Sequence, residues 1–497
     1  MFAVASIAAL AAGSYALNKH RKRGRGEYAP AESVPASADS FEEFESKMKR
    51  AKLNPSAIKA FKANYRALIS GQKTTMSETE ISPVESLPRL DDMKEAGDLS
   101  QLLEQTAVLK LNGGLGTSMG LEKAKSLLPV KDGQTFLDLI AQQVKYMRRT
   151  YKTQTQFILM NSFSTSTDTK DFFKTNHSDL LAEPNFELMQ NMSPKVDAAT
   201  LKPAAYPTDP DLEWCPPGHG DIYASLLGSG MLERLLEDGI KYLFVSNADN
   251  LGATLDLKLL NYFASSKLGF LMEAAERTEA DKKGGHLCYI GAKRLALRES
   301  AQCEPEDEVH FQNVQRHKYF NTNNLWIDLK QLQDCTTAAG GSMPLPLIKN
   351  SKTVNPRDKK SAKVFQLETA MGAAIESFKN AGAIVVPRTR FAPVKTCNDL
   401  VVLRSDAYEV TEDFRVQAAV EKVPFVKMDD EHYKLVDQVE ALMPTPPSLK
   451  GCVSLVVEGK VKFSPNTSFA GSQIIRNKSG ETRTLPAGNY TGGVFEL

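Results

Sequence analysis

The chain has 497 residues, of which 42% are hydrophobic and 24% are charged, and its formal net charge at pH 7 is +1. At roughly 100–200 residues per domain this length predicts more than one domain, with enough apolar residues for a large core. The near-zero charge excludes an overall field that attracts nucleic acid or an acidic surface, so any affinity for phosphate must come from local groups.

The amino-terminal 39 residues differ from the rest of the chain. Residues 2–17 are apolar, alanine-rich and uncharged, and residues 19–25 are mostly basic. The apolar run lacks the leading positive charge of a signal peptide and is short against the ~20 residues of a membrane span. Two interpretations stay open, a weak membrane anchor or targeting segment and a disordered tail. Residues 26–39, rich in Pro, Ala, Ser and Glu, are interpreted as a linker.

A helical region is predicted next. Ser40 and Glu43 have the spacing of a capping box ahead of an apolar stripe, which predicts a first helix. Apolar residues three and four apart between positions 58 and 68 predict a second helix, and residues 71–90 are interpreted as a loop.

From residue 106 short apolar runs alternate with helical patterns. Strands are expected at residues 107–111, 157–161, 242–246 and 270–274, with helices between them. Such alternation predicts a mostly parallel sheet covered by helices on both faces. In open sheets of this kind ligands bind beyond the carboxyl ends of the strands, so the chemistry is expected there.

The first of these strands leads into a loop with four glycines in eight residues, from Gly113 to Gly120. Glycine lets backbone N–H groups turn toward an anion, and Lys125 adds positive charge after the loop. Two known phosphate loops do not fit, because Met119 stands at the third glycine of G-x-G-x-x-G and Ala124 at the second glycine of the Walker loop. Taken alone, the loop is also compatible with a tight turn.

Two further strand or loop ends carry candidate groups. Asp249 follows the strand at 242–246 and suits Mg²⁺, although an Asp that caps a turn before Gly252 is the competing interpretation. His219 stands between two glycines at a helix start, where it can offer a hydrogen bond or a positive edge to a phosphoryl oxygen, or act only in packing.

Three more stretches complete the pattern. Residues 320–326 place asparagines between aromatic residues, which suits the recognition of sugar hydroxyls but also an ordinary turn. Arg388, Arg390 and Lys395 follow a strand ending near residue 387; they either neutralise a triphosphate or form a solvated basic loop. Beyond about residue 448, short β-prone pieces separated by Gly, Asn and Ser predict a small β-domain.

Together these motifs resemble the UDP-glucose pyrophosphorylases (UTP:glucose-1-phosphate uridylyltransferases), most closely their protozoan forms. The resemblance covers about residues 41–497 and rests on motifs in the family's order. They are Leu111-Asn112-Gly113-Gly114-Leu115-Gly116-Thr117-Ser118-Met119-Gly120 with Lys125, Pro217-Gly218-His219-Gly220-Asp221, Asn247-Ala248-Asp249-Asn250-Leu251-Gly252, Phe320-Asn321-Thr322-Asn323-Asn324-Leu325-Trp326 and Pro393-Val394-Lys395-Thr396. The stretches at 187–191 and 366–372 carry the protozoan likeness.

The resemblance implies an α/β fold, with a nucleotide-diphospho-sugar transferase-like mixed sheet flanked by helices and a C-terminal β-helix domain. The expected divisions are an apolar and basic segment with linker at 1–39, a helical region at 40–105, a nucleotidyltransferase catalytic domain at 106–410, and a C-terminal region with the small β-helix at 411–497.

The resemblance also implies the site. The residues expected to bind UTP and the sugar phosphate are Leu111, Asn112, Gly113, Gly114, Lys125, Gln190, Gly218, His219, Asn247, Asp249, Asn321, Asn323 and Lys395. Within this set Leu111 to Gly114, Gln190 and Gly218 would hold the nucleotide, and Asn321 and Asn323 the glucose. Lys125 and Lys395 would be catalytic by gripping the phosphates, and Asp249 would hold the cofactor Mg²⁺.

The implied reaction forms UDP-glucose and pyrophosphate from UTP and glucose 1-phosphate by Mg²⁺-assisted attack on the α-phosphorus. The alternative is a broad-specificity UDP-sugar pyrophosphorylase. A nicotinamide oxidoreductase is disfavoured by the failed glycine fingerprint, and a catalytically silent scaffold by the presence of both lysines, Asp249 and His219. No nucleic-acid partner is expected; a homo-oligomer formed through the C-terminal domain stays open. The scattered cysteines favour the cytoplasm, with residues 2–17 as an open tether or targeting segment.

Overall fold

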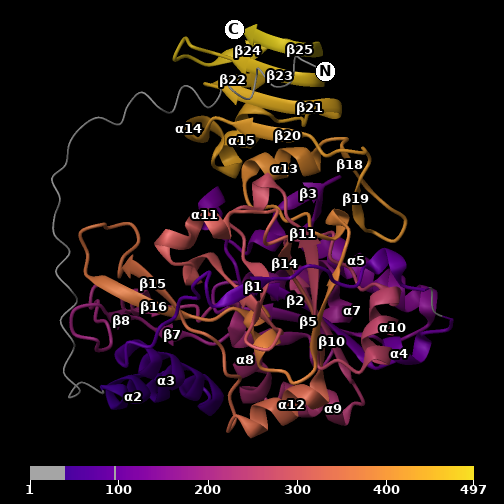
Figure 1. The fold of residues 1–497 in the computed structure, drawn as a ribbon. Helices are drawn as coiled ribbons and strands as arrows, with labels where there is room; N and C mark the ends of the chain where they lie inside the picture. The colour runs from indigo at the N-terminus through magenta and orange to yellow at the C-terminus, as the bar shows by residue number, and fades with distance from the viewer. Residues whose placement is uncertain (1–39, 95–96) are drawn as a thin grey trace. The chain divides into compact units, whose positions relative to one another are not determined.

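The computed structural model describes residues 40–94 and 97–497 (Figure 1). The predictions for the apolar segment, the basic cluster and the linker therefore lie outside the described residues. Within the described part of the chain, no helix combines the length and the hydropathy that a membrane crossing requires.

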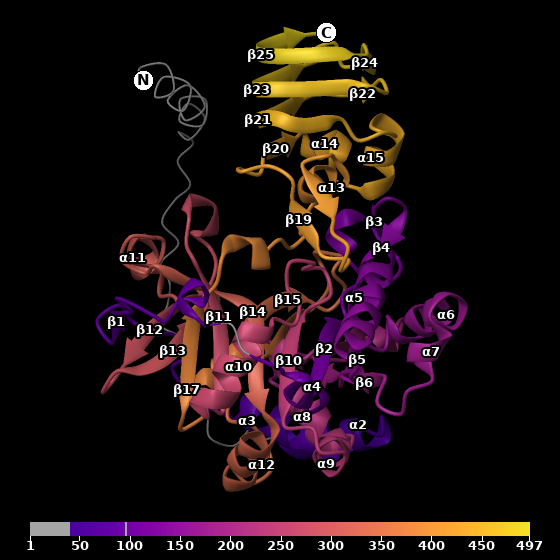
Figure 2. The ribbon, with the colours of Figure 1, turned by 90° about the vertical axis from the view of Figure 1, so that its right-hand side faces the viewer.

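Within the described residues, ten strands form one mixed sheet (Figures 1 and 2). Its central order is β6 (Glu187–Met189), β5 (Gln156–Asn161), β2 (Thr106–Asn112), β10 (Tyr242–Asn247), β14 (Tyr319–Asp328), β11 (Phe270–Glu276) and β17 (Ala381–Val385). At the start of β14 the sheet continues into β12 (His286–Ile290), which pairs with β13 (Arg294–Arg298) and β1 (Ile81–Pro83). The four predicted strands are confirmed as β2, β5, β10 and β11.

The parallel prediction fails at β14 and at the outer strands β12, β13 and β1, all of which pair antiparallel. β14 runs antiparallel to both β10 and β11, while β6, β5, β2 and β10 are parallel to one another. The sequence does not predict a strand over its first half, because Asn321, Thr322, Asn323 and Asn324 interrupt the apolar alternation. Tertiary hydrogen bonds satisfy these polar groups inside the sheet.

Helices cover both faces of the sheet because successive strand residues point in opposite directions. Leu109 of β2 packs in one apolar cluster with α8 (Ile222–Gly228), α9 (Met231–Glu237) and α12 (Leu329–Ala338). Its neighbour Val108 packs in another cluster with α10 (Leu257–Ser266). The predicted two-sided arrangement is therefore confirmed. Two further helices, α6 (Ser166–Asn176) and α7 (Ser178–Leu181), connect β5 to β6 along the chain.

The amino-terminal helices are α2 (Phe41–Arg50) and α3 (Pro55–Ile69), which pack through Phe44, Phe61 and Tyr65. The expected capping box is wrong in detail, because the Ser40 side chain makes no cap hydrogen bond and only its carbonyl accepts from the Glu43 N–H. In contrast, Asn54 caps α3 by accepting from the Ala57 N–H at 2.8 Å.

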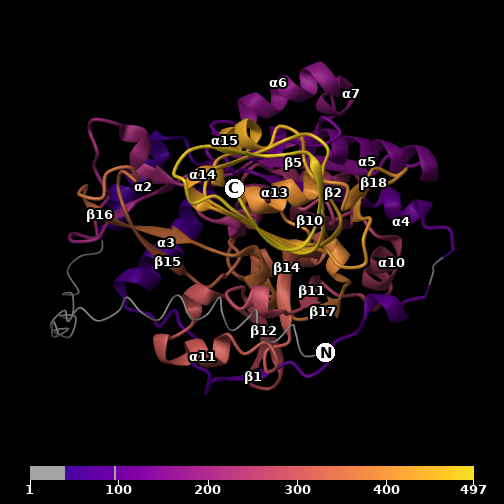
Figure 3. The same ribbon diagram turned by 90° about the horizontal axis from the view of Figure 1, so that it is seen from above.

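The carboxyl-terminal strands pair in parallel and lie one above another (Figure 2), and seen from above this part of the chain winds in overlapping turns (Figure 3). One sheet contains β20 (Phe425–Met428), β21 (Ser448–Glu458), β23 (Thr467–Arg476) and β25 (Gly488–Glu496), and a second contains β22 (Val461–Phe463) and β24 (Arg483–Leu485). These strands are not a separate core. Their buried side chains, Leu455 and Phe463 among them, share one apolar cluster with α13 (Cys397–Arg404) and with Val144 of α5 (Phe136–Tyr151).

Candidate functional site

A cavity of about 330 Å³ lies at the carboxyl ends of β2, β5 and β10, where the parallel topology predicts ligand binding. Its walls contain ten of the expected site residues, namely Leu111, Asn112, Gly113, Gly114, Lys125, Gln190, Gly218, His219, Asn247 and Asp249. Three expected residues, Asn321, Asn323 and Lys395, do not line this cavity.

The glycine loop after β2 is shaped by two different requirements. A Cβ on Gly113 would lie 2.8 Å from Oε1 of Gln190, so glycine at this position allows the Gln190 amide to approach the backbone, and a larger residue would displace that amide. Gly116 has a φ of +71° at the start of a short 3₁₀ turn, a conformation that favours glycine. The Lys125 N–H donates to the carbonyl of Gly114 at 3.1 Å, and this bond places Lys125 close to the carboxyl end of β2.

Lys125 joins three segments of the chain. Its Nζ donates to Oδ2 of Asp249 at 2.7 Å and to the carbonyl of Val394. The Val394 N–H donates in turn to the Asp249 carbonyl at 3.2 Å. Lys395 is the next residue; it is exposed, and its Nζ lies 5.6 Å from the centroid of the Phe391 ring. The site thus has one lysine, Lys125, paired with the Asp249 carboxylate, and a second, Lys395, that follows the contacted Val394 but stands outside the cavity wall.

A hydrogen bond from a distant backbone N–H holds His219 in one tautomer. Its Nδ1 accepts a hydrogen bond from the Met371 N–H at 3.0 Å, so a neutral ring carries its proton on Nε2. Burial lowers the pKa of His219 to about 4, which keeps the ring neutral at pH 7. A neutral His219 can serve as the predicted hydrogen-bond donor or act only in packing, but it does not supply the predicted positive edge.

The low pKa of His219 makes stability depend on pH. Below its ordinary value of 6.5 the unfolded chain takes up a proton that the folded chain refuses until about pH 4, so stability falls as pH falls through this window. We expect the wild type to lose up to about 3 kcal/mol more than His219→Asn between pH 7 and pH 4.5. Asparagine keeps an acceptor for Met371 without titrating. Equal losses in urea unfolding of both proteins would contradict this assignment.

The loop that carries His219 is tied to the end of β6. Gly218 has a φ of +80°, and a Cβ there would lie 2.5 Å from the Thr369 carbonyl oxygen. Gln190 Nε2 donates to the Gly218 carbonyl at 3.1 Å. Beside it, buried Asp221 accepts from the Asn191 N–H at 2.7 Å, and burial raises the pKa of Asp221 to about 6. The sequence does not identify Asn191 as the partner of Asp221, because the two residues are 30 positions apart and no local pattern connects them.

Asn321 and Asn323 form a small hydrogen-bonded unit at the irregular start of β14. Asn321 Nδ2 donates to Asn323 Oδ1 at 2.8 Å, and the Asn323 N–H donates to Asn321 Oδ1 at 2.8 Å. The φ of Asn323 is +60°, and the β11–β14 register shifts at this point. A Cβ on Gly372 would lie 2.7 Å from Asn321 Nδ2, and Gly372 follows the Met371 that holds His219. The pair is therefore next to the His219 wall of the cavity.

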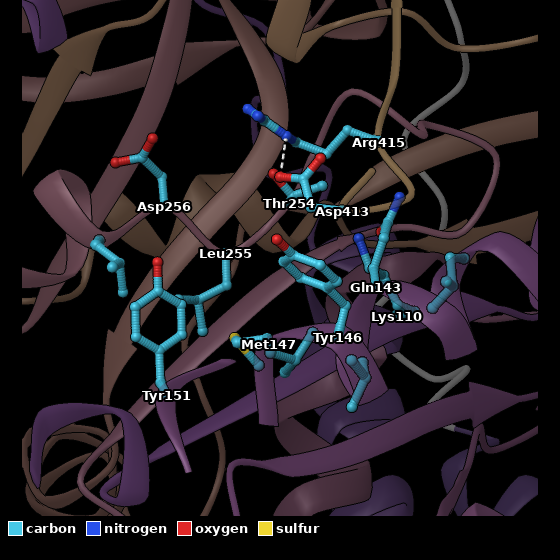
Figure 4. A pocket seen from close by; sticks show the side chains of 14 residues that line it. Lys110, Gln143, Tyr146, Met147, Tyr151, Thr254, Leu255, Asp256, Asp413 and Arg415 are labelled. Atoms are coloured by element: carbon cyan, nitrogen blue, oxygen red, sulfur yellow. Dashed lines mark ion pairs between the residues drawn. The ribbon is translucent and has the colours of Figure 1, made fainter. Parts of the chain in front are cut away.

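Lys110 was missed as a residue that supports the site, although a lysine inside an apolar strand is an unusual signal. Its Nζ donates to Ser246 Oγ at 2.7 Å and to the Ala253 carbonyl, on either side of the Asp249 loop. Burial and the Arg390 charge lower the pKa of Lys110 to about 7. A second cavity of about 250 Å³ lies over Lys110, between α5 and the Asp413–Arg415 ion pair (Figure 4).

The structure corrects one expected role, that of Arg390. The Arg390 guanidinium is buried and donates to both carboxylate oxygens of Glu273, each at 2.7 Å. Arg388 pairs with Asp281 at 2.8 Å. Neutralisation of a triphosphate by Arg390 is therefore wrong, because its guanidinium is buried and its charge is paired with Glu273.

Comparisons with known proteins agree on one family. Residues 58–469 match the family model described as UTP--glucose-1-phosphate uridylyltransferase. The probable UTP--glucose-1-phosphate uridylyltransferase of Schizosaccharomyces pombe is 37% identical over 453 residues, covering 88% of this chain and 88% of that protein. The Saccharomyces cerevisiae enzyme is 39% identical over 402 residues, covering 79% and 78%.

Solved structures show the same relationship. A mutant of UDP-glucose pyrophosphorylase from Leishmania major, in complex with UDP-glucose, superposes with a TM-score of 0.88 at 45% identity, covering 92% of this chain and 99% of that chain. The UDP-glucose phosphorylase of Trypanosoma brucei superposes with a TM-score of 0.85 at 47% identity, covering 92% and 99%.

Proposed function

The chain belongs to the UTP--glucose-1-phosphate uridylyltransferase family, and from this premise we propose that the 330 Å³ cavity is its active site. The family's activity is the formation of UDP-glucose and pyrophosphate from UTP and glucose 1-phosphate, and this chain is a nucleotidyltransferase of that kind. The observation that carries the proposal is the meeting of Lys125, Asp249 and the Val394–Lys395 segment, which come from three separate loops.

The proposed chemistry follows from the charges that must meet. A phosphate oxygen of glucose 1-phosphate attacks the α-phosphorus of UTP in line, and pyrophosphate leaves. The attacking phosphate is already ionised, so the site needs positioning and positive charge rather than a strong base. Lys125, held beside Asp249, would orient the phosphates, and exposed Lys395 would add charge where it develops.

The binding roles of the other residues are also proposals. Leu111 to Gly114, Gln190 and Gly218 would hold the nucleotide, supported by the narrow approach of Gly113 to Gln190. His219 and Asn247 would contact the sugar phosphate or nucleotide, with His219 Nε2–H as a donor. Asn321 and Asn323 would bind the glucose, supported by their place beside the Met371–Gly372 backbone.

We propose Mg²⁺ as the cofactor, held by Asp249. The fit rests on the Asp249 carboxylate, which is partly exposed at the cavity wall, because Mg²⁺ usually takes one or two protein carboxylates and completes its shell with substrate phosphates and water. When bound, the ion would neutralise charge on the phosphates. Asp249 also keeps Lys125 in place, since their 2.7 Å ion pair is only partly exposed.

The assay that tests the proposed function is pyrophosphate release from UTP, run in parallel with three sugar 1-phosphates. We expect release with glucose 1-phosphate, loss of release when EDTA removes divalent cations, and recovery when Mg²⁺ is restored in excess. Similar rates with galactose 1-phosphate would favour a broad-specificity UDP-sugar pyrophosphorylase. Silence with glucose, galactose and N-acetylglucosamine 1-phosphates would contradict the proposal.

The larger organisation is proposed on similar grounds. The parallel pairing of β20, β21, β23 and β25 beside β22 and β24 supports a small β-helix within residues 411–497. The domain limits 40–105 and 106–410 remain predictions. The outer strand β25, with Val494 and Phe495 exposed, supports a homo-oligomer formed through this region.

We also propose a cytoplasmic location. The six cysteines, all in the described residues, are free thiols, which suits a reducing compartment. A membrane tether or targeting role for residues 2–17 stays a prediction outside the described residues.

A further inference from the structure

A chain of hydrogen bonds crosses the ends of three neighbouring strands beneath the cavity. The Ser126 hydroxyl donates to Asn112 Oδ1, and Asn112 Nδ2 donates to Asn161 Oδ1 at 2.7 Å. Asn161 Nδ2 then donates to Glu187 Oε1 at 2.8 Å. These side chains belong to the loop after β2 and to β2, β5 and β6, and the first three are almost completely buried. We call this set the amide relay.

The relay has a direction because one end can only accept. An ionised carboxylate has no donor, so Glu187 requires the NH₂ group of Asn161. The Asn161 side-chain oxygen therefore faces Asn112 and accepts from the Asn112 NH₂ group. The Asn112 side-chain oxygen is then free to accept from the Ser126 hydroxyl. Burial acts to raise the pKa of Glu187, but hydrogen bonds from Lys170, Ser166 and Asn161 outweigh this effect and hold the pKa below its ordinary value. The carboxylate is therefore ionised at neutral pH.

The relay joins the segments that line the site. Asn112 immediately precedes Gly113, and Ser126 follows Lys125. The backbone carbonyl of Asn161 accepts from the Gln190 N–H at 2.8 Å, which holds the cavity-lining residue Gln190 against β5. A reversed amide would place two oxygens or two NH₂ groups face to face in a buried region, where an unmade hydrogen bond is costly.

We propose that Glu187 is a positioning residue that sets the direction of the amide relay and thereby holds the nucleotide-binding segments at Asn112, Lys125 and Gln190 in one arrangement. This inference rests on the proposed function. Glu187 itself does not line the cavity, so it acts through Asn161 and Asn112.

The test exchanges the carboxylate between two positions of the relay. Glu187→Gln can present either an oxygen or an NH₂ group, so the direction is lost, and we expect KM for UTP to rise about tenfold. Asn161→Asp places two carboxylates face to face, with a similar rise. The double variant Glu187→Gln/Asn161→Asp restores the direction, because the introduced glutamine can donate to the introduced aspartate, which still accepts from Asn112. We expect its KM for UTP to return to within about threefold of the wild type.

The pH profile supplies an independent readout. In Asn161→Asp, acidification protonates one of the two facing carboxyl groups and supplies the missing donor, so KM for UTP is expected to fall toward the wild-type value as pH is lowered from about 8 to about 6. The wild type and the double variant are expected to show no such fall. KM for glucose 1-phosphate is expected to change little in all of them.

The control is Lys170→Met, which removes the ion pair to Glu187 but no member of the relay. We expect its KM for UTP to stay within about twofold of the wild type. If Asn161→Asp alone does not fold, the comparison of the double variant with Glu187→Gln still tests the proposal. The double variant is then expected to fold and to have a lower KM for UTP than Glu187→Gln.

Two failures are distinguishable. If the wild type turns over UTP but the folded double variant binds it no better than Glu187→Gln, the relay proposal is overturned while the function stands. If the wild type itself does not turn over UTP, the proposed function is overturned, and the inference that rests on it falls as well.

Discussion

Replacing Lys395 by alanine is expected to lower kcat by roughly 10²–10³-fold, the usual loss when one preorganised charge or donor is removed from a transition state. Two anions must approach each other in the proposed transfer, and Lys395 adjoins the Val394 carbonyl that Lys125 contacts. The protein is expected to remain folded, with stability changed by no more than about 0.5 kcal/mol, because the Lys395 side chain is exposed. Steady-state rates and thermal unfolding measure the two effects.

The segment stays in place without that side chain. The backbone N–H groups of Lys395 and Thr396 both donate to Asp399 Oδ2, at 2.9 and 2.8 Å, in the capping box of α13. Lys427→Ala is the matched control, because Lys427 is an exposed lysine on β20, and its kcat is expected to stay at the wild-type value. Normal turnover by Lys395→Ala would remove this lysine from the mechanism.

Replacing Arg390 by methionine is expected to destabilise the protein by about 3–5 kcal/mol, because the change leaves Glu273 charged, buried and without its cation. The carboxylate would keep only the neutral donors Trp326 Nε1, at 3.0 Å, and Asn324 Nδ2, at 3.1 Å. The midpoint of urea or thermal unfolding measures the loss. Part of the stability is expected to return in the double variant Glu273→Gln/Arg390→Met, since glutamine is neutral and can still accept from Trp326.

The matched control for this prediction is the neighbouring arginine. Arg388 forms a partly exposed ion pair with Asp281 at 2.8 Å, and exposed pairs contribute only about 0–1 kcal/mol. Arg388→Met is therefore expected to shift the unfolding midpoint little. Equal shifts for the two arginine variants would show that burial of the Arg390–Glu273 pair does not control its contribution.

Arg390 also connects stability to the site. The Arg390 carbonyl accepts from Asn250 Nδ2 at 3.1 Å, and the Ala392 N–H donates to Asn250 Oδ1 at 3.0 Å. Asn250 follows Asp249 directly, so this side chain fastens the segment that leads to Lys395 onto the loop of the proposed metal ligand. A loosened Arg390 is expected to reduce activity as well as stability, whereas Lys395→Ala is expected to reduce activity alone.

Local sequence patterns were sufficient for the elements that depend on near neighbours. The apolar runs that became β2, β5, β10 and β11, the helices between them, and the glycine loop at Gly113 all follow from period and turn chemistry. The recurrence of familiar motifs then placed the chain in its family, which the comparisons confirm. The antiparallel β14 was missed because its asparagines are satisfied only after the sheet has formed.

Contacts between distant residues were decided by the tertiary structure. The sequence alone determined that Lys125 follows a glycine loop and that Asp249 follows a strand, but their 2.7 Å contact joins residues 124 positions apart. It also could not distinguish Arg390, buried against Glu273, from Arg388 at the surface, or show that Glu187 faces Asn161. The physical reason is that dihedral preference and apolar period act over a few residues, whereas burial and hydrogen-bond partners depend on which strands and loops are packed together.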